Sequence, residues 1–270
     1  MSEALERLDR ARILADLSEA ARAELSGLEV FPTLDSTNTY LVRGANRGQA
    51  SGAVCLAEQQ TAGRGRRGRH WVTPFGASLA LSLLWRFDAS PEALSGLSLV
   101  TGIAVARALA GVGVSEVGLK WPNDIWWRER KLGGILLESG GAANQVYVVA
   151  GVGLNVALPP RDAALIDQPW VDLQEILRSA PVARNRLAAL LINELIAAFR
   201  QFQQQGFIGF VAEWARFDRV AGRPVQVHLP NVSFAGIARG VDGTGALLLE
   251  TPNGRVTPYC GGEVSLRVAE

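Results

Sequence analysis

The stretch GLKWPNDIWWRERKLGGILLES, residues 118–139, contains two extended apolar runs separated by a short charged segment. The runs at 118–127 and 131–139 have the length and composition of β-strands, and the charged residues 128–130 between them are typical of a turn. The pattern therefore predicts a β-hairpin. Lys120, Asn123 and Asp124 lie within the tryptophan-rich first run. Because buried polar groups need partners, they indicate either a ligand cleft or a structural hydrogen-bond network.

The segment before this hairpin predicts a buried strand, a loop and one long helix. AVCLAEQQ (53–60) has the apolar character of a buried strand. Ser90 and Pro91 suit the N-cap and the first position of a helix, and residues 92–111 continue it. Because this helix is apolar on nearly all sides, we expect it at the centre of the core.

The segment after the hairpin predicts another buried strand and an amphipathic helix. VYVVAGVGLNVAL (146–158) is almost entirely apolar, and its Asn155 is either a satisfied core amide or a site residue. Residues 184–205 carry leucine and phenylalanine at helical spacing, and Gly206 predicts the end of that helix. Strands alternating with helices predict an α/β fold for this part of the chain.

The pattern of apolar and turn residues changes after Gly222. The remaining residues form short alternating runs separated by turn residues such as Asp242-Gly243, which predicts a small antiparallel barrel. We therefore expect three parts: a helical segment at 1–27, a main α/β domain at 28–221 and a C-terminal barrel at 222–270.

The N-terminal segment, residues 1–27, predicts one or two short amphipathic helices that end at Gly27. A helix-turn-helix that reads DNA would need a basic face toward phosphate. Six acidic residues outnumber four arginines here, so we expect helices that pack against the rest of the protein.

The overall composition excludes several classes of protein. The 270 residues include 27 basic and 26 acidic side chains, so the chain has no general attraction for nucleic acid or anionic membranes. The apolar runs are shorter than the roughly 18 residues of a membrane span, and the charged first dozen residues do not resemble a signal peptide. Two cysteines and two histidines form neither a disulfide framework nor a zinc site. The sequence predicts a cytoplasmic protein without a fixed metal site.

GRGRRGRHW, residues 63–71, concentrates four arginines among glycines. It matches G-x-G-x-x-G, but Pro74 and Gly76 follow closely, so the helix that a dinucleotide site requires cannot start there. The chain also has no Gly-Lys pair for a Walker A loop and no G-x-S-x-G elbow.

The arginines of this loop repel one another: two such charges about 6 Å apart repel by roughly 0.7 kcal/mol in water. We expect the empty loop to be mobile and a bound anion to order it; a solvated loop or a nucleic-acid patch are the alternatives.

Taken together, these stretches resemble the biotin protein ligases. The resemblance runs from about Val30 to Arg267 with the motifs in order, and their combination is far more specific than any one of them. The matching segments are Asp35-Ser36-Thr37-Asn38, AEQQTAGRGRRGRHW (57–71), KWPNDI (120–125), RKLGGILLE (130–138), GVGLNV (151–156), FDRVAGRPV (217–225) and GGEVSLR (261–267).

The resemblance implies a fold and a two-step reaction. The fold is an α/β domain like that of class II aminoacyl-tRNA synthetases, followed by an SH3-like barrel. In the reaction, biotin attacks the α-phosphate of MgATP to give biotinyl-5′-AMP. A lysine of a carboxylase carrier domain, such as that of acetyl-CoA carboxylase, then takes the biotin and releases AMP.

The resemblance also implies the roles of individual residues. The implied biotin-binding residues are Ser36, Thr37, Asn38, Gln60, Arg64, Gly65, Arg66, Lys131 and Gly134. The implied nucleotide-binding residues are Arg64, Arg66, Arg69, Asn123, Asp124, Asn155, Trp170 and Arg267. Lys131 is the main catalytic group, which stabilises charge, and Arg66 is the second. Trp170 is expected to stack on adenine, and Mg²⁺ to arrive with ATP near Asp124. The arginine loop is expected to close over the adenylate and exclude water.

Two departures from the family pattern matter. His70 stands where a lysine is common. Bifunctional members carry a winged-helix domain of about 60 residues before the Ser-Thr-Asn motif, whereas only some 30 residues precede it here. We therefore expect a ligase without a DNA-binding domain. A lipoate ligase and a biotin-responsive DNA-binding regulator are the alternative functions, and the sequence leaves a monomer and a homodimer open.

Overall fold

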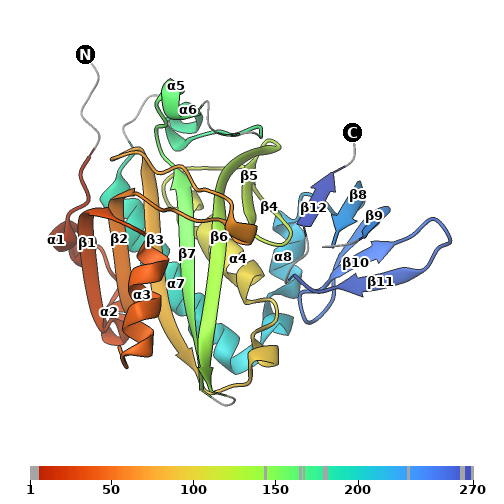
Figure 1. Cartoon of the computed structure of the whole chain (residues 1–270), viewed down its shortest axis with the longest axis horizontal. Coiled ribbons are helices and arrows are strands. Elements are labelled where there is room, and N and C mark those ends of the chain that lie inside the picture. The colour runs from red at the N-terminus through yellow and green to blue at the C-terminus, as the bar shows by residue number, and fades with distance from the viewer. Residues whose placement is uncertain are drawn as a thin grey trace.

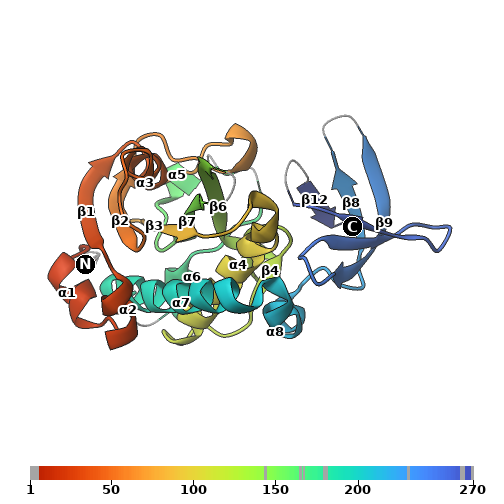
Figure 2. The same cartoon turned by 90° about the horizontal axis from the view of Figure 1, so that it is seen from below.

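The computed structural model describes residues 6–142, 145–163, 166, 168–178, 182–229, 232–261 and 265–268. They form a seven-stranded sheet with helices on both faces and a five-stranded sheet beside it (Figures 1 and 2). In chain order, the elements are α1 (Arg10–Ala15), α2 (Glu19–Glu24), β1 (Gly27–Leu34), α3 (Thr37–Asn46), β2 (Ala53–Gln60), the 3₁₀ turn η1 (Arg66–Gly68), β3 (Ser78–Phe87), η2 (Pro91–Leu94), α4 (Leu97–Ala110), β4 (Val117–Lys120), β5 (Asp124–Trp127), β6 (Arg130–Ala142), β7 (Gln145–Asn155), α5 (Pro160–Ala163), α6 (Leu173–Leu177), α7 (Arg184–Gln205), η3 (Phe207–Phe210), α8 (Val211–Phe217), β8 (Pro224–His228), β9 (Ser233–Val241), β10 (Leu247–Glu250), β11 (Val256–Tyr259) and β12 (Ser265–Val268).

The large sheet has the strand order β1-β2-β3-β7-β6-β5-β4, in which β1 and β2 are parallel and the other neighbours antiparallel. Helices α4 and α7 lie on one face and α3 on the other (Figure 2). Along β2, Val54 and Leu56 belong to the main core with α4 and α7, whereas Cys55 belongs to the cluster beneath α3. Burial on both faces explains why the central strands are apolar without alternation.

Helix α4 packs against β4, β5 and β6 of the sheet and against α7, and it is buried on nearly all sides. Among the described residues, Pro91–Ala110 is the one helical stretch long and apolar enough to span a membrane, and its place in the core accounts for that composition. The prediction of one helix from residue 91 to 111 is wrong. Gly96, with φ of +82°, separates η2 from α4, and a Cβ there would lie 2.6 Å from the Phe207 ring.

The predicted hairpin at residues 118–139 is confirmed for its second half. Strands β5 and β6 pair in an antiparallel manner, and both residues of the two-residue turn, Arg128 and Glu129, have positive φ, as a type I′ turn requires. The prediction of one strand over 118–127 is wrong, because β4 and β5 form a hairpin of their own. Pro122 cannot donate to a strand ladder and lies in the turn between them.

The N-terminal segment packs on the main domain as expected. Asp9 and Ser18 cap α1 and α2, and Ile13 and Ala21 are buried in the main core. Residues 1–5 of the segment lie outside the described residues. Helix α3 was not predicted, although Ser36 provides a recognisable N-cap whose hydroxyl accepts a hydrogen bond from the Thr39 amide.

The C-terminal sheet is antiparallel, with the order β11-β10-β9-β8-β12. Within the described residues β11 and β12 form no ladder with each other, so the predicted barrel is not closed. Closure requires strands long enough to tilt and stagger around an axis, and β10, β11 and β12 have only four residues each.

The C-terminal sheet is joined to the main domain by core packing and by hydrogen bonds. Val227 and Leu249 belong to the main core. The Trp121 indole donates to the Gly245 carbonyl (3.1 Å), and the Ser95 hydroxyl donates to the Thr244 carbonyl (2.8 Å). These contacts place the turn between β9 and β10 beside Trp121, and residues of β12 line the same cavity as the turn between β4 and β5. The boundaries predicted at 28–221 and 222–270 stay predictions.

Candidate active site

A cavity of about 500 Å³ opens where the large sheet meets β12. Its walls come from the start of α3, the end of β2, the arginine loop (residues 63–70), the β4–β5 turn, β6, β7 and β12. Lys120 and Lys131, the two lysines of the chain, both line it. The predicted site residues on its walls are Ser36, Thr37, Asn38, Gln60, Arg64, Gly65, Arg66, Arg69, Asn123, Asp124, Lys131, Gly134 and Arg267.

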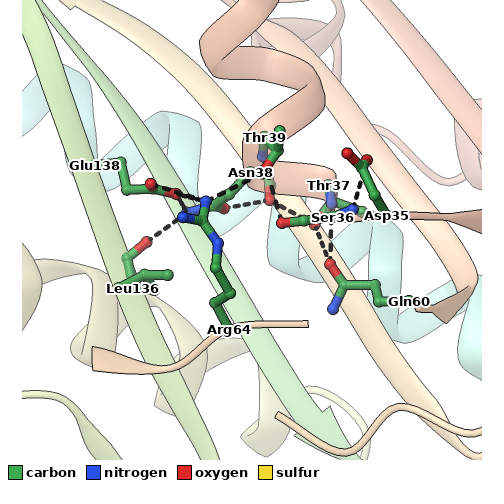
Figure 3. A network of polar contacts seen from close by, with 10 residues as sticks. Asp35, Ser36, Thr37, Asn38, Thr39, Gln60, Arg64, Leu136 and Glu138 are labelled. Atoms are coloured by element: carbon green, nitrogen blue, oxygen red, sulfur yellow. Dashed lines mark hydrogen bonds and ion pairs between the residues drawn. The ribbon is translucent and has the colours of Figure 1, made fainter. Parts of the chain in front are cut away.

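The uncharged side chains of Thr37, Asn38 and Gln60 line one end of the cavity. Figure 3 shows them in one polar network with Arg64 and Glu138. Both the amide and the hydroxyl of Thr37 approach Gln60 Oε1, at 2.9 and 3.2 Å. Asn38 is almost fully buried, and its Nδ2 donates to the Leu136 carbonyl at 3.1 Å. Behind these residues, Ser82 Oγ lies 2.8 Å from Thr37 Oγ1 and 2.6 Å from Asn38 Oδ1. We call this set of side chains the neutral end.

Glu138 on β6 connects the neutral end to the arginine loop. Figure 3 shows the Arg64 side chain extending toward it. The Arg64 guanidinium donates to both Glu138 oxygens, at 3.0 and 3.1 Å, and to Thr39 Oγ1 at 3.0 Å. Asn38 Nδ2 donates to the same carboxylate at 2.8 Å. One acidic side chain therefore orients both a loop arginine and a buried amide.

The arginine loop lies across the cavity. Its backbone is drawn together by a hydrogen bond from the Gly65 amide to the Arg69 carbonyl, at 2.7 Å. The Arg66 guanidinium donates to Asn123 Oδ1 at 3.2 Å and to the Gly261 carbonyl beyond β11. Burial lowers the pKa of Arg66, and the nearby Asp124 carboxylate partly offsets this. Arg66 thus connects the loop to both the main domain and the C-terminal sheet.

The other end of the cavity carries most of its positive charge, and we call it the cationic end. Lys131 Nζ lies 2.7 Å from Asp124 Oδ1, and both side chains are about 15% exposed. Lys120 Nζ lies over the Trp126 ring, 4.8 Å from its centroid. Burial lowers the pKa of Lys120, and Asp124 opposes that shift. Together with Arg69 and Arg267, these side chains form a site suited to several negative charges.

Two predicted site residues do not line the cavity. Asn155 is buried beneath it, and its Nδ2 donates to the Val171 carbonyl at 3.1 Å. This arrangement corresponds to the first of the two alternatives, a core amide with a hydrogen-bond partner. Trp170 packs beside Ala77 and Leu158. Its backbone forms a bridge to Lys131, so it supports the strand that carries the lysine.

Three residues at or beside the cavity, Trp71, Glu138 and Ser82, were not predicted from the sequence. Trp71 lines the cavity with its ring 5.8 Å from Lys131 Nζ, and it lies within a quoted motif. Glu138 is a charged residue at the end of an apolar run, and this position could have indicated a site residue. Ser82 is fully buried in an apolar strand, and only the folded structure reveals its partners.

Two glycines of β7, Gly151 and Gly153, form part of the cavity wall. A Cβ on Gly151 would lie 2.2 Å from Asn38 Oδ1, and one on Gly153 would lie 2.5 Å from the Trp71 indole nitrogen. Side chains at these two positions would displace residues of the cavity itself.

Two family models match the chain. The model of the biotin/lipoate A/B protein ligase family matches residues 30–155, and that of the biotin protein ligase C-terminal domain matches residues 220–267. The chain is 42% identical to the bifunctional ligase/repressor BirA of Escherichia coli, over 100% of this chain and 81% of BirA. It is 37% identical to the biotin–[acetyl-CoA-carboxylase] ligase of Mycobacterium tuberculosis, over 96% and 99% of the two chains.

Solved structures agree with these matches. The biotin protein ligase from Aquifex aeolicus in complex with biotin and ATP superposes with a TM-score of 0.75 at 26% identity, covering 91% of this chain and 100% of that one. Fold, cavity and sequence thus define a ligase-type enzyme. The chain belongs to the biotin protein ligase family.

Proposed function

We propose that this enzyme activates biotin with ATP to form biotinyl-5′-AMP and then transfers the biotin to a lysine of a carrier protein. The observation that carries the proposal is one cavity with a neutral end and a cationic end. Leu136 at the neutral end and Lys131 at the cationic end are five residues apart on β6. This corresponds to about 16 Å at a rise of about 3.3 Å per residue.

The neutral end suits the ureido ring of biotin. A ureido group has two N–H donors and one carbonyl acceptor and carries no charge. Thr37, Asn38 and Gln60 offer hydroxyl and amide groups of both kinds. The valeryl chain would then run past Trp71 and carry its carboxylate to the cationic end.

Lys131 is suited to the first step. An ammonium group has three donors, and one is directed at Asp124, 2.7 Å away. The other two can bind the biotin carboxylate and the α-phosphate together. A carboxylate oxygen attacks the α-phosphorus, the bond to the β-phosphate oxygen breaks, and pyrophosphate leaves. Fixed positive charge stabilises the negative charge that develops in this step.

The arginine loop is suited to protecting the product. Biotinyl-5′-AMP is a mixed anhydride and reacts with water, so a closed cavity preserves it. The Arg66 contacts to Asn123 and Gly261 hold the loop across that cavity. In the second step the amine of a carrier lysine attacks the anhydride carbonyl, AMP leaves, and an amide remains.

Magnesium is proposed to enter with ATP. Within the described parts of the chain, no three His, Cys, Asp or Glu side chains are arranged to hold a metal. Mg²⁺ bound to nucleotides keeps several waters and takes one or two protein carboxylates. Asp124, beside Asn123 on the cavity wall, fits that mode.

The acceptor is proposed to be the biotin carboxyl carrier domain of a carboxylase, because the Mycobacterium tuberculosis relative is named for that reaction. A cytoplasmic location, where ATP and such carriers are available, is part of the proposal. The absence of a DNA-binding function and the oligomeric state stay predictions. Lipoate is the second substrate named by the family model, but the Mycobacterium tuberculosis relative is named for biotin.

Transfer of labelled biotin to a purified carrier domain tests the proposal. We expect ATP-dependent labelling, biotin-dependent exchange between ATP and pyrophosphate, and competition by unlabelled biotin but not by lipoate. A carrier whose acceptor lysine is replaced by arginine is the control. Labelling without ATP, or competition by lipoate alone, would contradict it.

A further inference from the structure

Ser82 is the centre of the hydrogen bonds behind the neutral end. Its side chain is 0% exposed, and its hydroxyl lies between two residues that line the cavity, Thr37 and Asn38. The Oγ atom is 2.6 Å from Asn38 Oδ1 and 2.8 Å from Thr37 Oγ1. Ser82 itself is not on the cavity wall, so any effect on a ligand must pass through its two neighbours.

The Asn38 amide is oriented by two acceptors on β6. Its Nδ2 donates to the Leu136 carbonyl at 3.1 Å and to Glu138 Oε2 at 2.8 Å. Neither oxygen can serve as a donor when Glu138 is ionised. The amide nitrogen is therefore fixed toward β6, and Asn38 Oδ1 is fixed toward Ser82.

Counting protons then determines the direction of each hydrogen bond. A hydroxyl has one proton, and Asn38 Oδ1 can only accept, so Ser82 donates its proton to Asn38. The contact between Ser82 and Thr37 must then use the Thr37 proton. In the reverse arrangement, Asn38 Oδ1 would have no donor at 2.6 Å from another oxygen, which is costly for a buried group. Gln60 Oε1 does not need the Thr37 proton, since the Thr37 amide already donates to it at 2.9 Å.

We propose that Ser82 is a positioning residue that determines how the site recognises the ureido ring. By taking the Thr37 proton, it leaves the Thr37 oxygen as an acceptor toward the cavity, where it selects a ligand N–H over a ligand oxygen. Glu138 anchors the arrangement through Asn38. This inference rests on the proposed function, because it concerns the biotin end of the same cavity.

Kinetics of Ser82→Ala test the proposal. Without the serine oxygen, Thr37 can donate its proton to Gln60 or to the ligand. We expect KM for biotin to rise about tenfold, the effect of one lost hydrogen bond, with KM for ATP unchanged. Ser78→Ala is the matched control, because Ser78 is also 0% exposed on β3 and its hydroxyl has no partner among the described residues. That variant should retain the wild-type KM for biotin.

Substrate analogues separate positioning from a merely structural effect. The probes are the two carbamate analogues of biotin, in which one ureido N–H is replaced by oxygen, and desthiobiotin, which keeps the ureido group. The wild-type enzyme should discriminate against one carbamate analogue at least about tenfold, and Ser82→Ala should lose that discrimination. Its preference between biotin and desthiobiotin should not change. Equal discrimination in both proteins would overturn the proposal.

Ser82→Cys provides a second variant of nearly the same volume. A thiol is a weak donor and acceptor, so this variant should lose part of the discrimination while remaining folded. Calorimetric measurement of biotin binding without ATP distinguishes a failure of the proposed function from a failure of the proposed role of Ser82. A wild-type protein that binds no biotin contradicts the proposed function. A wild-type protein that binds biotin, with Ser82 variants that bind and discriminate equally well, contradicts only the positioning role.

Discussion

Lys131 illustrates how one side chain depends on its neighbours. Its ammonium is held by Asp124 at 2.7 Å and lies 5.8 Å from the Trp71 ring centroid. The bridge between Lys131 and Trp170 fixes the backbone that carries it. A flexible four-carbon side chain is thereby given one position, as its proposed contacts with two substrates would require.

Replacing Lys131 by alanine should abolish adenylate formation. The variant loses the charge expected to stabilise the α-phosphate during attack, and we expect at least about a hundredfold loss in exchange between ATP and pyrophosphate. Asp124→Asn is a graded companion, because it keeps the lysine but removes its partner. Normal turnover by a folded Lys131→Ala protein would contradict the assigned role.

At this scale the sequence predicted which residues gather at the cavity better than how each side chain is oriented, and the roles of these residues stay predictions. Most of the predicted residues line one cavity. Asn155 does not, because a position in a strand such as β7 does not tell which side of the sheet a side chain occupies when both sides are apolar. Trp170 does not either; it lies outside the named strands, and its packing beside Ala77 and Leu158 is decided by the fold. Ser82 and Glu138 were missed for a related reason: their importance lies in partners 44 and 74 residues or more away in the chain.

Among the elements, the arginine loop was expected to be mobile, and in the structure two of its side chains contact other parts of the protein. Its four arginines repel one another, yet Arg64 and Arg66 are each bound to residues of other elements. Glu138 and Asn123 therefore hold the loop through contacts within the protein itself. A ligand that brings negative charge would add to these contacts rather than create them all.

Trypsin should report the state of this loop. We expect cleavage after the arginines among residues 64–69 in the ligand-free protein and its suppression by biotin plus ATP, because the bound adenylate neutralises the repulsion. Arg255, exposed in the turn between β10 and β11, is the internal control, and cleavage there should not depend on ligand. Equal cleavage of the loop in both conditions would refute the expected ordering.

Replacing Arg66 by glycine should release the intermediate. The variant loses the contacts to Asn123 and Gly261, so activated biotin should escape and label lysines of a bystander protein several-fold more than the wild type does. Arg161→Ala is the control, since that side chain is 86% exposed on α5. Bystander labelling that stays at the wild-type level would reject the protective role of the loop.

Helix and strand predictions succeeded where local signals were strong. The amphipathic helix at 184–205 and its stop at Gly206 are confirmed. The predictions of a single helix at 91–111 and a single strand at 118–127 were wrong, because contacts with distant or facing residues determined where these elements end. Phe207 packs against Gly96, and the β4 ladder to β5 places Pro122 in a turn.

For the whole molecule, a buried ion pair joins the N-terminal segment to the sheet and α7. Arg184 is 0% exposed, lies 2.7 Å from Glu58 Oε2 and donates to the Ser78 carbonyl. The Leu8 amide donates to the same glutamate at 2.6 Å. Glu58 is two residues before Gln60, so this pair supports the strand that leads into the cavity.

Breaking this pair should destabilise the protein. Arg184→Met leaves a buried carboxylate without its partner, and we expect a loss of about 3–5 kcal/mol in the free energy of unfolding in urea. The double variant Arg184→Met/Glu58→Gln should recover much of that loss, because no buried charge remains. A single variant within about 1 kcal/mol of wild type would contradict the structural role.

Both lysines of the chain are enclosed in the cavity, while the other 25 of its 27 basic side chains are arginines. A guanidinium does not accept an acyl group under conditions in which a free amine does. An acyl-adenylate that leaks away would thus meet no other side-chain amine on the protein that made it. The enzyme therefore offers few side chains for self-acylation, and we expect escaped intermediate to acylate lysines of other proteins.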